Sequence, residues 1–538
     1  MKKLIFAFAL VFSVIPCQAR IITVDNDEPA DFTNIQAAID DSNNGDVVEV
    51  QPGTYTGLGN RDIDFKGKAI TVRSTDPNDP DVVAATIIDG EGNHDWCMEG
   101  WCEEHRGFHF HSGEDPNSVL AGFTITKFCA PDIQRYGGLM PGGGGILCEN
   151  SSPTISQCII INNWAHHWGE GVGGGGIHSK GGSPIINQCT ISDNEGYVGA
   201  GGIDCEGGSP IVNQCLIINN WAPFSAGGVY GCPRITNCTI SNNTGGSGGG
   251  ISDSHLIDNC AITGNVAIWR GGGIYGNPIV SHCTIAHNTV PYGGGGGGLY
   301  CTSSNCASSH CIISGNSAQS GYQFEEWVDG VGGGIYCGNN TPTITQCTVT
   351  ANTADANGGG IYGSPTITNS IVWANNCPNE PQISGAPNIS YSNIQGGFAG
   401  IGIIEVDPLF ADTAKADYHL KSEAGRWDPN SQTWVIDANT SPCIDAGDPN
   451  SDWTAELWPH GKRINMGAYG GTPEASMSLS DVGNVADLNS DDTVDFLDFA
   501  DFNNNWQSTK VLLSEDLDRN GLVDLRDFAI FADNWLWP

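Results

Sequence analysis

The fold of this 538-residue chain is decided by the stretch at residues 142–163, GGGGILCENSSPTISQCIIINN, which recurs in nine copies up to residue 375. Each copy keeps an apolar residue after its glycines, a cysteine or serine nine or twelve residues later, and an asparagine five residues after that. The cysteine position holds Cys158, Cys189, Cys215, Cys238, Cys260, Cys283, Cys311, Cys347 and Ser370. The asparagines are Asn163, Asn194, Asn220, Asn243, Asn265, Asn288, Asn316, Asn352 and Asn375.

The spacing within each copy predicts short β-strands. Cys158 and Ile160 are two residues apart, so both point to one face of a strand. The apolar stretches are short and separated by proline or glycine, which leaves no room for a helix. Such a unit cannot bury its apolar face alone, so copies must stack at roughly 4.8 Å per rung. We expect the invariant asparagine to occupy a left-handed turn and to bond the asparagine of the next rung.

These registered copies resemble the repeats of the pectate-lyase-like right-handed parallel β-helix family, over roughly residues 20–400. The resemblance implies an all-β fold, a right-handed parallel β-helix with three short strands per rung. That fold carries hydrolases, lyases, epimerases and non-enzymes. The chain shows neither the aspartate and arginine motifs of known pectate lyases nor the aspartate and histidine motifs of polygalacturonases. The resemblance therefore implies a role related to polysaccharides but transfers no catalytic residue.

The ends of the repeat region are expected to close the solenoid. Residues 32–41 place Ile35, Ala38 and Ile39 on one face and predict a short amphipathic helix that caps the first rung. Residues 396–471 are interpreted as closing rungs with a cap. The chain therefore divides into a signal peptide at 1–19, a β-helix at 20–475 and a separate module at 476–538.

The first nineteen residues have the pattern of an export signal. Two lysines precede an apolar run of twelve residues, and Ala19 ends a segment that suits signal peptidase cleavage. A lipoprotein anchored at Cys17 is the less favoured alternative, because Pro16 stands where a small residue is wanted. We expect a secreted or cell-surface bacterial protein without a membrane span, since no later stretch is long and apolar enough to cross a bilayer.

The charge of the chain limits its partners. Acidic residues number 60 against 21 basic residues, which gives a formal net charge of −39. Such a surface repels phosphate backbones and anionic membranes, so we expect no nucleic-acid partner. The same repulsion disfavours polyanionic sugars less firmly, because a cation can bridge them to the protein.

Two acidic runs near the C-terminus have the spacing of twelve-residue calcium loops. Oxygen ligands fall at positions 1, 3, 5, 9 and 12 of each run, with a backbone carbonyl at position 7, and an apolar run that can form a helix follows. The predicted calcium ligands are Asp487, Asn489, Asp491, Thr493, Asp495 and Asp498, then Asp516, Asp518, Asn520, Leu522, Asp524 and Asp527. A solvated acidic tail would not repeat this register twice.

The paired loops resemble a type I dockerin, including aspartate at position 12 of each loop. Asp492 departs from the pattern, because glycine is usual at that sharp turn. The resemblance places partner contacts at Phe496 and Leu497 and at Leu525 and Arg526, which lack the hydroxyl pair common in cellulosome dockerins. It implies a calcium-dependent, α-helical module that attaches residues 476–538 to a cohesin-like or cell-surface protein.

The cysteines allow two interpretations. An exported protein favours disulfides, and Cys97 and Cys102 lie in an irregular loop where they could pair. The repeated cysteines instead favour buried thiols that act as small apolar fillers, because parallel side chains on stacked rungs hold their Cβ atoms too far apart. No group of cysteines and histidines has the spacing of a zinc site.

Aromatic and polar residues collect after the asparagines and are expected to share one edge of the solenoid. Exposed rings beside carboxylates and imidazoles suit stacking on sugars, with polar groups contacting the hydroxyls. The alternative is that the rings fold back and cover the edge. The candidate ligand-binding residues are Trp164, His166, His167, Trp168, Glu170, Trp221, Trp269, Glu325, Glu326 and Trp327. A second stripe, from Tyr230 to Tyr362, is expected to face outward and is equally explained by β-propensity.

The sequence predicts an exported β-helix protein that binds extracellular polysaccharide and is tethered through its calcium module. Whether it also degrades the polysaccharide stays open. A polysaccharide lyase or glycoside hydrolase is one alternative, with Glu170, Glu325, Glu326 and Asp329 as a group of carboxylates that would have to converge. A non-catalytic surface or adhesion scaffold is the other.

Overall fold

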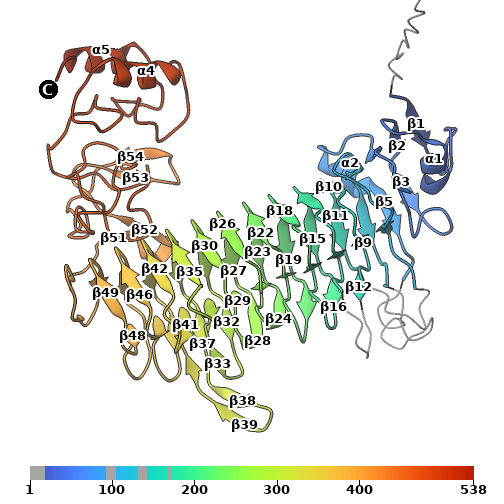
Figure 1. Cartoon of the computed structure of the whole chain (residues 1–538), viewed down its shortest axis with the longest axis horizontal. Helices are drawn as coiled ribbons and strands as arrows, with labels where there is room; N and C mark the ends of the chain where they lie inside the picture. The colour runs from blue at the N-terminus through green and yellow to red at the C-terminus, as the bar shows by residue number, and fades with distance from the viewer. Residues whose placement is uncertain (1–18, 93–103, 131–141, 166–172, 538) are drawn as a thin grey trace, which may run out of the picture.

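The computed structural model describes residues 19–92, 104–130, 142–165 and 173–537. The proposed signal segment, the Cys97–Cys102 pair and four of the candidate ligand residues lie outside them: His166, His167, Trp168 and Glu170. The described chain forms a long stack of parallel strands with a small helical module at its C-terminal end (Figure 1). In the described ranges, no helix is long and apolar enough to cross a bilayer.

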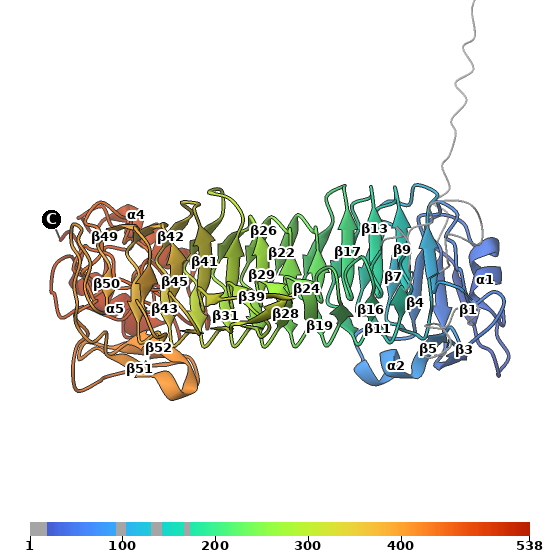
Figure 2. The ribbon, with the colours of Figure 1, turned by 90° about the horizontal axis from the view of Figure 1, so that it is seen from below.

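Four parallel sheets run along the stack (Figure 2). Sheet A contains β1 (Ile21–Val24), β2 (Val47–Val50), β4 (Thr71–Ser74), β7 (Val119–Ala121), β10 (Thr154–Ser156), β14 (Ile185–Asn187), β18 (Ile211–Asn213), β22 (Arg234–Thr236), β26 (Leu256–Asp258), β30 (Ile279–Ser281), β35 (Ala307–Ser309), β42 (Thr343–Thr345), β46 (Thr366–Thr368) and β49 (Asn388–Ser390). Sheet B contains β3 (Gly53–Tyr55), β5 (Thr86–Asp89), β8 (Thr124–Thr126), β11 (Ile159–Ile161), β15 (Thr190–Ser192), β19 (Leu216–Ile218), β23 (Thr239–Ser241), β27 (Ala261–Thr263), β31 (Thr284–Ala286), β36 (Ile312–Ser314), β43 (Thr348–Thr350), β47 (Ile371–Trp373) and β50 (Asn393–Ile394).

The other two sheets complete each rung. Sheet C contains β6 (Phe108–Phe110), β9 (Ile146–Glu149), β13 (Ile177–Lys180), β17 (Ile203–Glu206), β21 (Val229–Tyr230), β25 (Ile251–Ser252), β29 (Ile274–Gly276), β34 (Leu299–Cys301), β41 (Ile335–Gly338), β45 (Ile361–Gly363) and β48 (Ile383–Ser384). Sheet D contains β12 (Trp164–Ala165), β16 (Glu195–Gly196), β20 (Trp221–Ala222), β24 (Thr244–Ser247), β28 (Val266–Arg270), β32 (Thr289–Val290), β37 (Ser317–Ala318) and β44 (Thr353–Ala354).

The stack is a parallel β-helix, consistent with the right-handed form that the family resemblance implies. The chain passes through sheets C, A, B and D in each central rung, so the prediction of three strands per rung is wrong there. The fourth strand follows the invariant asparagine and is often only two residues long. Trp164, for example, pairs with Glu195, and Glu195 pairs with Trp221. Sequence patterns miss such strands because two residues show no periodicity.

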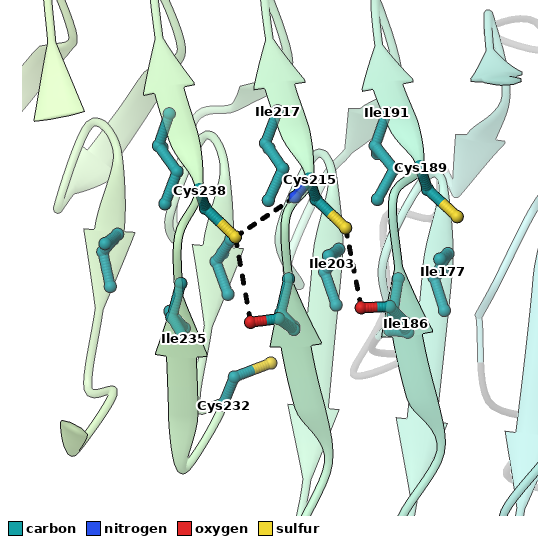
Figure 3. Close-up of a cluster of buried hydrophobic side chains, with 14 of the residues drawn as sticks. Ile177, Ile186, Cys189, Ile191, Ile203, Cys215, Ile217, Cys232, Ile235 and Cys238 are labelled. Carbon is teal, nitrogen blue, oxygen red and sulfur yellow. Dashed lines mark hydrogen bonds between the residues drawn. The ribbon is translucent and has the colours of Figure 1, made fainter. Parts of the chain in front are cut away.

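Like side chains lie above one another in the core, as the repeat predicts. Ile160 pairs in register with Ile191, which pairs with Ile217, and all three are fully buried. Figure 3 shows Cys189 beside Ile191 and Cys215 beside Ile217 in two of these rungs. Cys215 Sγ lies 3.6 Å from the carbonyl oxygen of Ile186, a weak hydrogen bond from the thiol to the neighbouring rung. The repeated cysteines are free and buried, which confirms that they fill the core as thiols.

Two disulfides occur at positions that the sequence did not indicate. Cys205 and Cys232 come from neighbouring rungs, with Cα atoms 5.1 Å apart, and Cys301 pairs with Cys306 five residues later. In sheet C, Asp204 pairs with Tyr230, so strict register places Cys205 opposite residue 231. The bridge is therefore diagonal, and the argument from directly stacked side chains does not apply to it.

The invariant asparagines form a continuous column of hydrogen bonds. Asn220 Nδ2 donates to Asn243 Oδ1 at 2.9 Å, and Asn243 Nδ2 donates to Asn265 Oδ1 at 3.0 Å. The left-handed residue is not the invariant asparagine but the residue before it, such as Asn242 with φ of 55°. This corrects the predicted turn. The preceding residue takes the left-handed conformation, which turns the invariant side chain inward.

The two ends of the stack differ. Helix α1 (Ile35–Asp41) covers the first rungs, with Ile35, Ala38 and Ile39 buried as predicted (Figure 2). A second short helix, α2 (Pro80–Ala85), follows β4. At the other end, residues 396–471 are only partly rungs. They form the antiparallel pairs β51 (Phe410–Asp412) with β52 (Asp417–Leu420) and β53 (Arg426–Asp428) with β54 (Thr433–Val435), plus the 3-10 turn η1 (Thr413–Lys415).

The closing segment at 396–475 folds back against the solenoid. Gln346 Nε2 donates to the carbonyl of Asn465 at 3.0 Å, and Asn369 Nδ2 donates to Ser451 Oγ at 2.9 Å. The C-terminal module beyond it contains α4 (Phe496–Asn504) and α5 (Leu525–Asp533), both helical as predicted (Figure 1). The module has its own small core, which includes Ala486, Val494, Phe502, Leu517, Val523 and Phe531.

Candidate functional site

A line of aromatic rings follows the sheet D edge of the solenoid. Tyr197 contacts Phe224 with ring centroids 5.1 Å apart, Phe224 lies 6.1 Å from Trp269, and Trp269 lies 6.0 Å from Phe324. These four residues come from separate rungs or loops and are brought together only by stacking. We call them the aromatic strip. Phe224 is 51% exposed and Phe324 is 83% exposed, so the strip presents ring surface to solvent.

A hairpin projects beside the strip. It consists of β38 (Gly321–Gln323) and β39 (Glu326–Val328), and Figure 1 shows it extending from the edge of the stack. Its turn residues, Phe324 and Glu325, both have positive φ, as a tight two-residue hairpin requires. Gln323 Nε2 donates to the carbonyl oxygens of Ile268, at 3.3 Å, and Gly293. These hydrogen bonds attach the hairpin to two rungs and hold Phe324 beside Trp269, at the end of the strip.

The hairpin and the residue after it carry three of the four carboxylates of the predicted group. Glu325 and Glu326 are exposed at the tip, and Asp329 Oδ1 accepts a hydrogen bond from Trp327 Nε1 at 3.1 Å. Glu170, the remaining member of the predicted group, lies outside the described residues.

The other predicted ligand residues have different surroundings. Trp164 is only 8% exposed and packs against Cys129, so its ring fills the edge of the core, and its assignment to a binding surface is wrong. Trp221 is half-buried at the start of β20. Trp269 belongs to the strip, and Trp327 is 59% exposed on the hairpin, where it contacts Tyr322.

The outer face of sheet C carries titratable groups that the sequence did not single out as a site. His109 pairs in register with Leu147, Leu147 with His178, and His178 with Asp204. His178 and Asp204 are buried although they face away from the core. The backbone at Gly173 and Gly199 lies directly against these two side chains. Only glycine allows this close approach, because a Cβ on Gly173 would collide with His178 and one on Gly199 would collide with Asp204.

Burial perturbs the acid–base properties of this face. Burial, with a smaller repulsion from Glu206, raises the pKa of Asp204 to about 7, and the backbone N–H of Ala200 donates to its carboxylate at 3.1 Å. Burial also lowers the pKa of His109, against the opposing effect of Glu149, whose Oε2 lies 2.9 Å from Nε2 of the ring. A signal was present in the sequence, because these residues lie one or three positions after the apolar residue that starts each sheet C strand.

Farther along the same face, tyrosines form the predicted outward stripe. Centroid distances are 5.4 Å from Tyr275 to Tyr300, 4.3 Å from Tyr300 to Tyr336 and 5.4 Å from Tyr336 to Tyr362. Arg270 lies 5.6 Å above the ring of Tyr300. All four rings are half-buried, so much of their surface is used in contacts with one another and with neighbouring loops.

The two acidic loops of the C-terminal module have matching hydrogen bonds. Backbone N–H groups of Asp491 and Asp492 donate to Asp487, as those of Asn520 and Gly521 donate to Asp516. The position-12 carboxylates are fully buried, and each accepts the N–H of the position-9 residue at 2.8 Å: Asp498 from Asp495 and Asp527 from Asp524.

The second loop meets a geometric requirement for a cation. Asp516, Asp518 and Asp527 each place one carboxylate oxygen within 4.8 Å of the others. An oxygen-only donor set with three carboxylates fits calcium better than a softer metal. The residues present therefore fit a calcium loop, with the clearest convergence in the second copy.

The chain is similar to one protein-family model and to solved structures. The sequence model of a family described as "Disaggregatase related" matches residues 311–447, which cover the last rungs and part of the closing segment. No curated protein matches the chain. A crystal structure of pectate lyase Pel9A is similar at 13% sequence identity and a TM-score of 0.34, with 84% of this chain and 96% of that chain covered.

Proposed function

We propose that this protein is exported, binds extracellular polysaccharide along the aromatic strip, and is attached to a partner through its calcium-loop module. The continuous line from Tyr197 to Phe324 carries the proposal. A sugar ring presents an apolar face of C–H groups, and aromatic rings bind such faces while hydroxyl groups stay hydrated or bonded at the rim. Because the strip follows the long axis, several successive sugar units of one chain can contact it.

The attachment role rests on the C-terminal module. Calcium would be held by the carboxylates at positions 1, 3 and 12 of the second loop, Asp516, Asp518 and Asp527, and by the corresponding residues of the first loop. The bound ion would neutralise like charges that otherwise repel one another. Phe496, Leu497 and Leu525, at the partner positions implied by the dockerin resemblance, are 76%, 61% and 72% exposed. These apolar residues suit a cohesin-like or cell-surface protein.

Affinity electrophoresis in gels that contain neutral or acidic polysaccharides tests the binding proposal. Phe224→Ala and Phe324→Ala should each weaken binding by about 0.5–1.5 kcal/mol, or roughly two- to tenfold, because each removes one stacking surface. Tyr362→Ala, on the tyrosine stripe of sheet C, is the matched control and should leave mobility unchanged. Equal mobility of all four proteins in every gel would show that the strip is not the binding surface.

Catalysis is the second candidate function, and the raised pKa of Asp204 favours it. A carboxylic acid with a pKa of about 7 can donate a proton at neutral pH, as glycoside hydrolysis requires, but Asp204 is only 3% exposed, so the backbone that covers it would have to move before a substrate could reach it. Release of reducing ends or unsaturated products from a polysaccharide panel, with and without calcium, tests for hydrolase or lyase activity. Activity that disappears in Asp204→Asn supports an enzyme. Retained binding without any product supports a non-catalytic scaffold.

A further inference from the structure

The two calcium loops differ at their sharpest turn. Gly521 takes φ of 87° in the second loop, and Asp492 takes φ of 71° at the equivalent position of the first. A residue with a Cβ atom is disfavoured by roughly 1–2 kcal/mol in the left-handed region, although aspartate tolerates it better than most. An aspartate at this position therefore carries a conformational cost that glycine avoids.

The side chain of Asp492 contacts a lysine of the closing segment. Lys462 Nζ contacts Asp492 Oδ1, and these two residues belong to different parts of the chain, before and after the connection at residues 476–484. The Asp492 side chain is 65% exposed, so it points out of its own loop toward the lysine. Only the backbone N–H of Asp492 takes part in the hydrogen bonds that the loop makes to Asp487.

A second cation connects the other loop to the same segment. Arg519 Nη2 donates to the carbonyl of Trp458 at 3.0 Å, and Nη1 donates to the carbonyls of Leu513 and Asp516, both at 2.9 Å. The guanidinium group therefore links the backbone of a loop that includes a predicted calcium ligand to the closing segment. Arg519 occupies position 4 of its loop, outside the predicted ligand set.

The closing segment and the C-terminal module together line one cavity. A cavity of about 280 Å³ is lined from the closing segment by Glu456, Trp458 and His460, and from the module by Asp487, Leu488 and Arg519. Glu456 Oε1 accepts the N–H groups of Asn465, at 2.8 Å, and Gly471, at 2.7 Å, which fixes the shape of the closing-segment wall.

We propose that residues 454–462 are a docking surface for the calcium loops of the C-terminal module, with Asp492 and Arg519 as the docking residues. The module is then held at the end of the solenoid instead of swinging on its connection. Helices α4 and α5 lie on the side away from the solenoid (Figure 1), so the exposed Phe496, Leu497 and Leu525 remain free for an external partner. Because the docking residues belong to the loops, calcium that orders the loops also strengthens docking; this last step rests on the proposed calcium binding.

The full-length protein with Asp492→Gly provides the sharpest test. Glycine relieves the left-handed turn, so calorimetry should give calcium affinity at least equal to that of the wild type. Loss of the Lys462 contact should nevertheless release the module. Chymotrypsin should then cleave at Leu479, in the exposed part of the connection, roughly two- to fivefold faster, because a partly exposed ion pair contributes little more than this. Mass spectrometry of the released fragment measures the rate.

Matched variants separate docking from loop folding. Lys462→Ala should accelerate cleavage as much as Asp492→Gly, and the double variant should add nothing further. Asp533→Ala, which removes an exposed carboxylate from the end of α5, should behave as the wild type. Equal rates for all variants, or fully additive effects of the two substitutions, would overturn the docking. If the wild type binds no calcium, the inference that calcium strengthens docking fails. The cleavage rates without calcium still decide whether residues 454–462 hold the module.

Discussion

Removal of one side chain from the middle of the asparagine column should destabilise the β-helix strongly. Asn243 is fully buried. Its Nδ2 donates to the carbonyl of Ile217 at 2.9 Å and to Asn265 Oδ1 at 3.0 Å. Its Oδ1 accepts from both the backbone N–H and Nδ2 of Asn220, each at 2.9 Å. Asn243→Ala removes all four hydrogen bonds at a site without access to water.

The expected loss follows from the groups left behind. An unsatisfied buried polar group costs about 1–3 kcal/mol, and neighbours can relax toward some of the four orphaned partners. We therefore expect the free energy of unfolding to fall by about 3–6 kcal/mol. Asn213→Ala is the matched control. Asn213 makes three side-chain hydrogen bonds, to Asn187, Thr236 and Asn237, but it lies half-buried on the outer surface, where water replaces them. Its loss should be about 1 kcal/mol.

Urea unfolding followed by circular dichroism measures both variants against the wild type. Hydrogen exchange should locate the effect, with faster exchange in the rungs on either side of residue 243 for Asn243→Ala only. The reasoning is refuted if the two substitutions destabilise the protein equally. It is also refuted if Asn243→Ala costs less than about 1 kcal/mol, since the column would then contribute no more than ordinary surface hydrogen bonds.

Three further outcomes are expected. Ala351, exposed with φ of 56°, precedes an invariant asparagine, so Ala351→Gly should stabilise the protein by about 1 kcal/mol in the same urea assay. Burial raises the pKa of Asp204 from 3.8 to about 7 in the folded state. The contribution of Asp204 to the free energy of unfolding should therefore be most favourable below pH 4, where the carboxyl is protonated in both states, and should be lost as the pH rises to 7. Asp204→Asn should remove this pH dependence and be more stable than the wild type at pH 8 by up to about 4 kcal/mol. Asp518→Ala should leave thermal stability in a chelator unchanged but reduce the gain from calcium, which is about 2.7 kcal/mol at a hundredfold excess over Kd.

Periodic features of the fold could be predicted from the sequence, because stacking places equivalent residues of successive copies directly above one another. Ile160, Ile191 and Ile217 are equivalent in the repeat and therefore lie in one column. The end helix could be predicted for a different reason, since Ile35, Ala38 and Ile39 show a helical period and an open first rung needs cover. Neither inference required knowledge of the handedness or of the number of sheets.

Features without a period could not be predicted. The sheet D strands are often two residues long, too short for any pattern, and the diagonal Cys205–Cys232 bridge depends on an offset between rungs of different length. The left-handed position was assigned one residue too late, because Asn163 and its equivalents are invariant while the preceding residues vary from asparagine to alanine. The invariant asparagine is the residue that forms the column of hydrogen bonds, whereas the left-handed conformation belongs to the residue before it.

Residues of the candidate sites could likewise be placed from the sequence where they follow the repeat, but not where their burial depends on tertiary contacts. Trp269 could be placed on a shared edge because it follows an invariant asparagine, but the burial of Trp164 depends on contact with Cys129, which lies in an earlier rung. Asp204 lies on a regular rung, and the sequence pattern pairs it convincingly with no second carboxylate. Its burial comes from backbone laid across the outer face of sheet C, a tertiary contact that residue spacing alone does not encode.

The glycine runs explain why functional side chains are restricted to so few places. A Cβ atom on Gly202 would lie 2.6 Å from the carbonyl oxygen of Gly228 and 3.2 Å from Nδ2 of Asn220, so the chain between sheets D and C must pass close to the asparagine column without side chains. Residues that could contact a ligand are thereby excluded from this part of every rung. They remain in the loops between the asparagine and the glycines, where Phe224 lies, and at exposed positions on the outer face of sheet C. Substitutions at Phe224 and at Asp204 therefore test the proposed binding and the proposed catalysis separately, because these two residues lie in different parts of the rung.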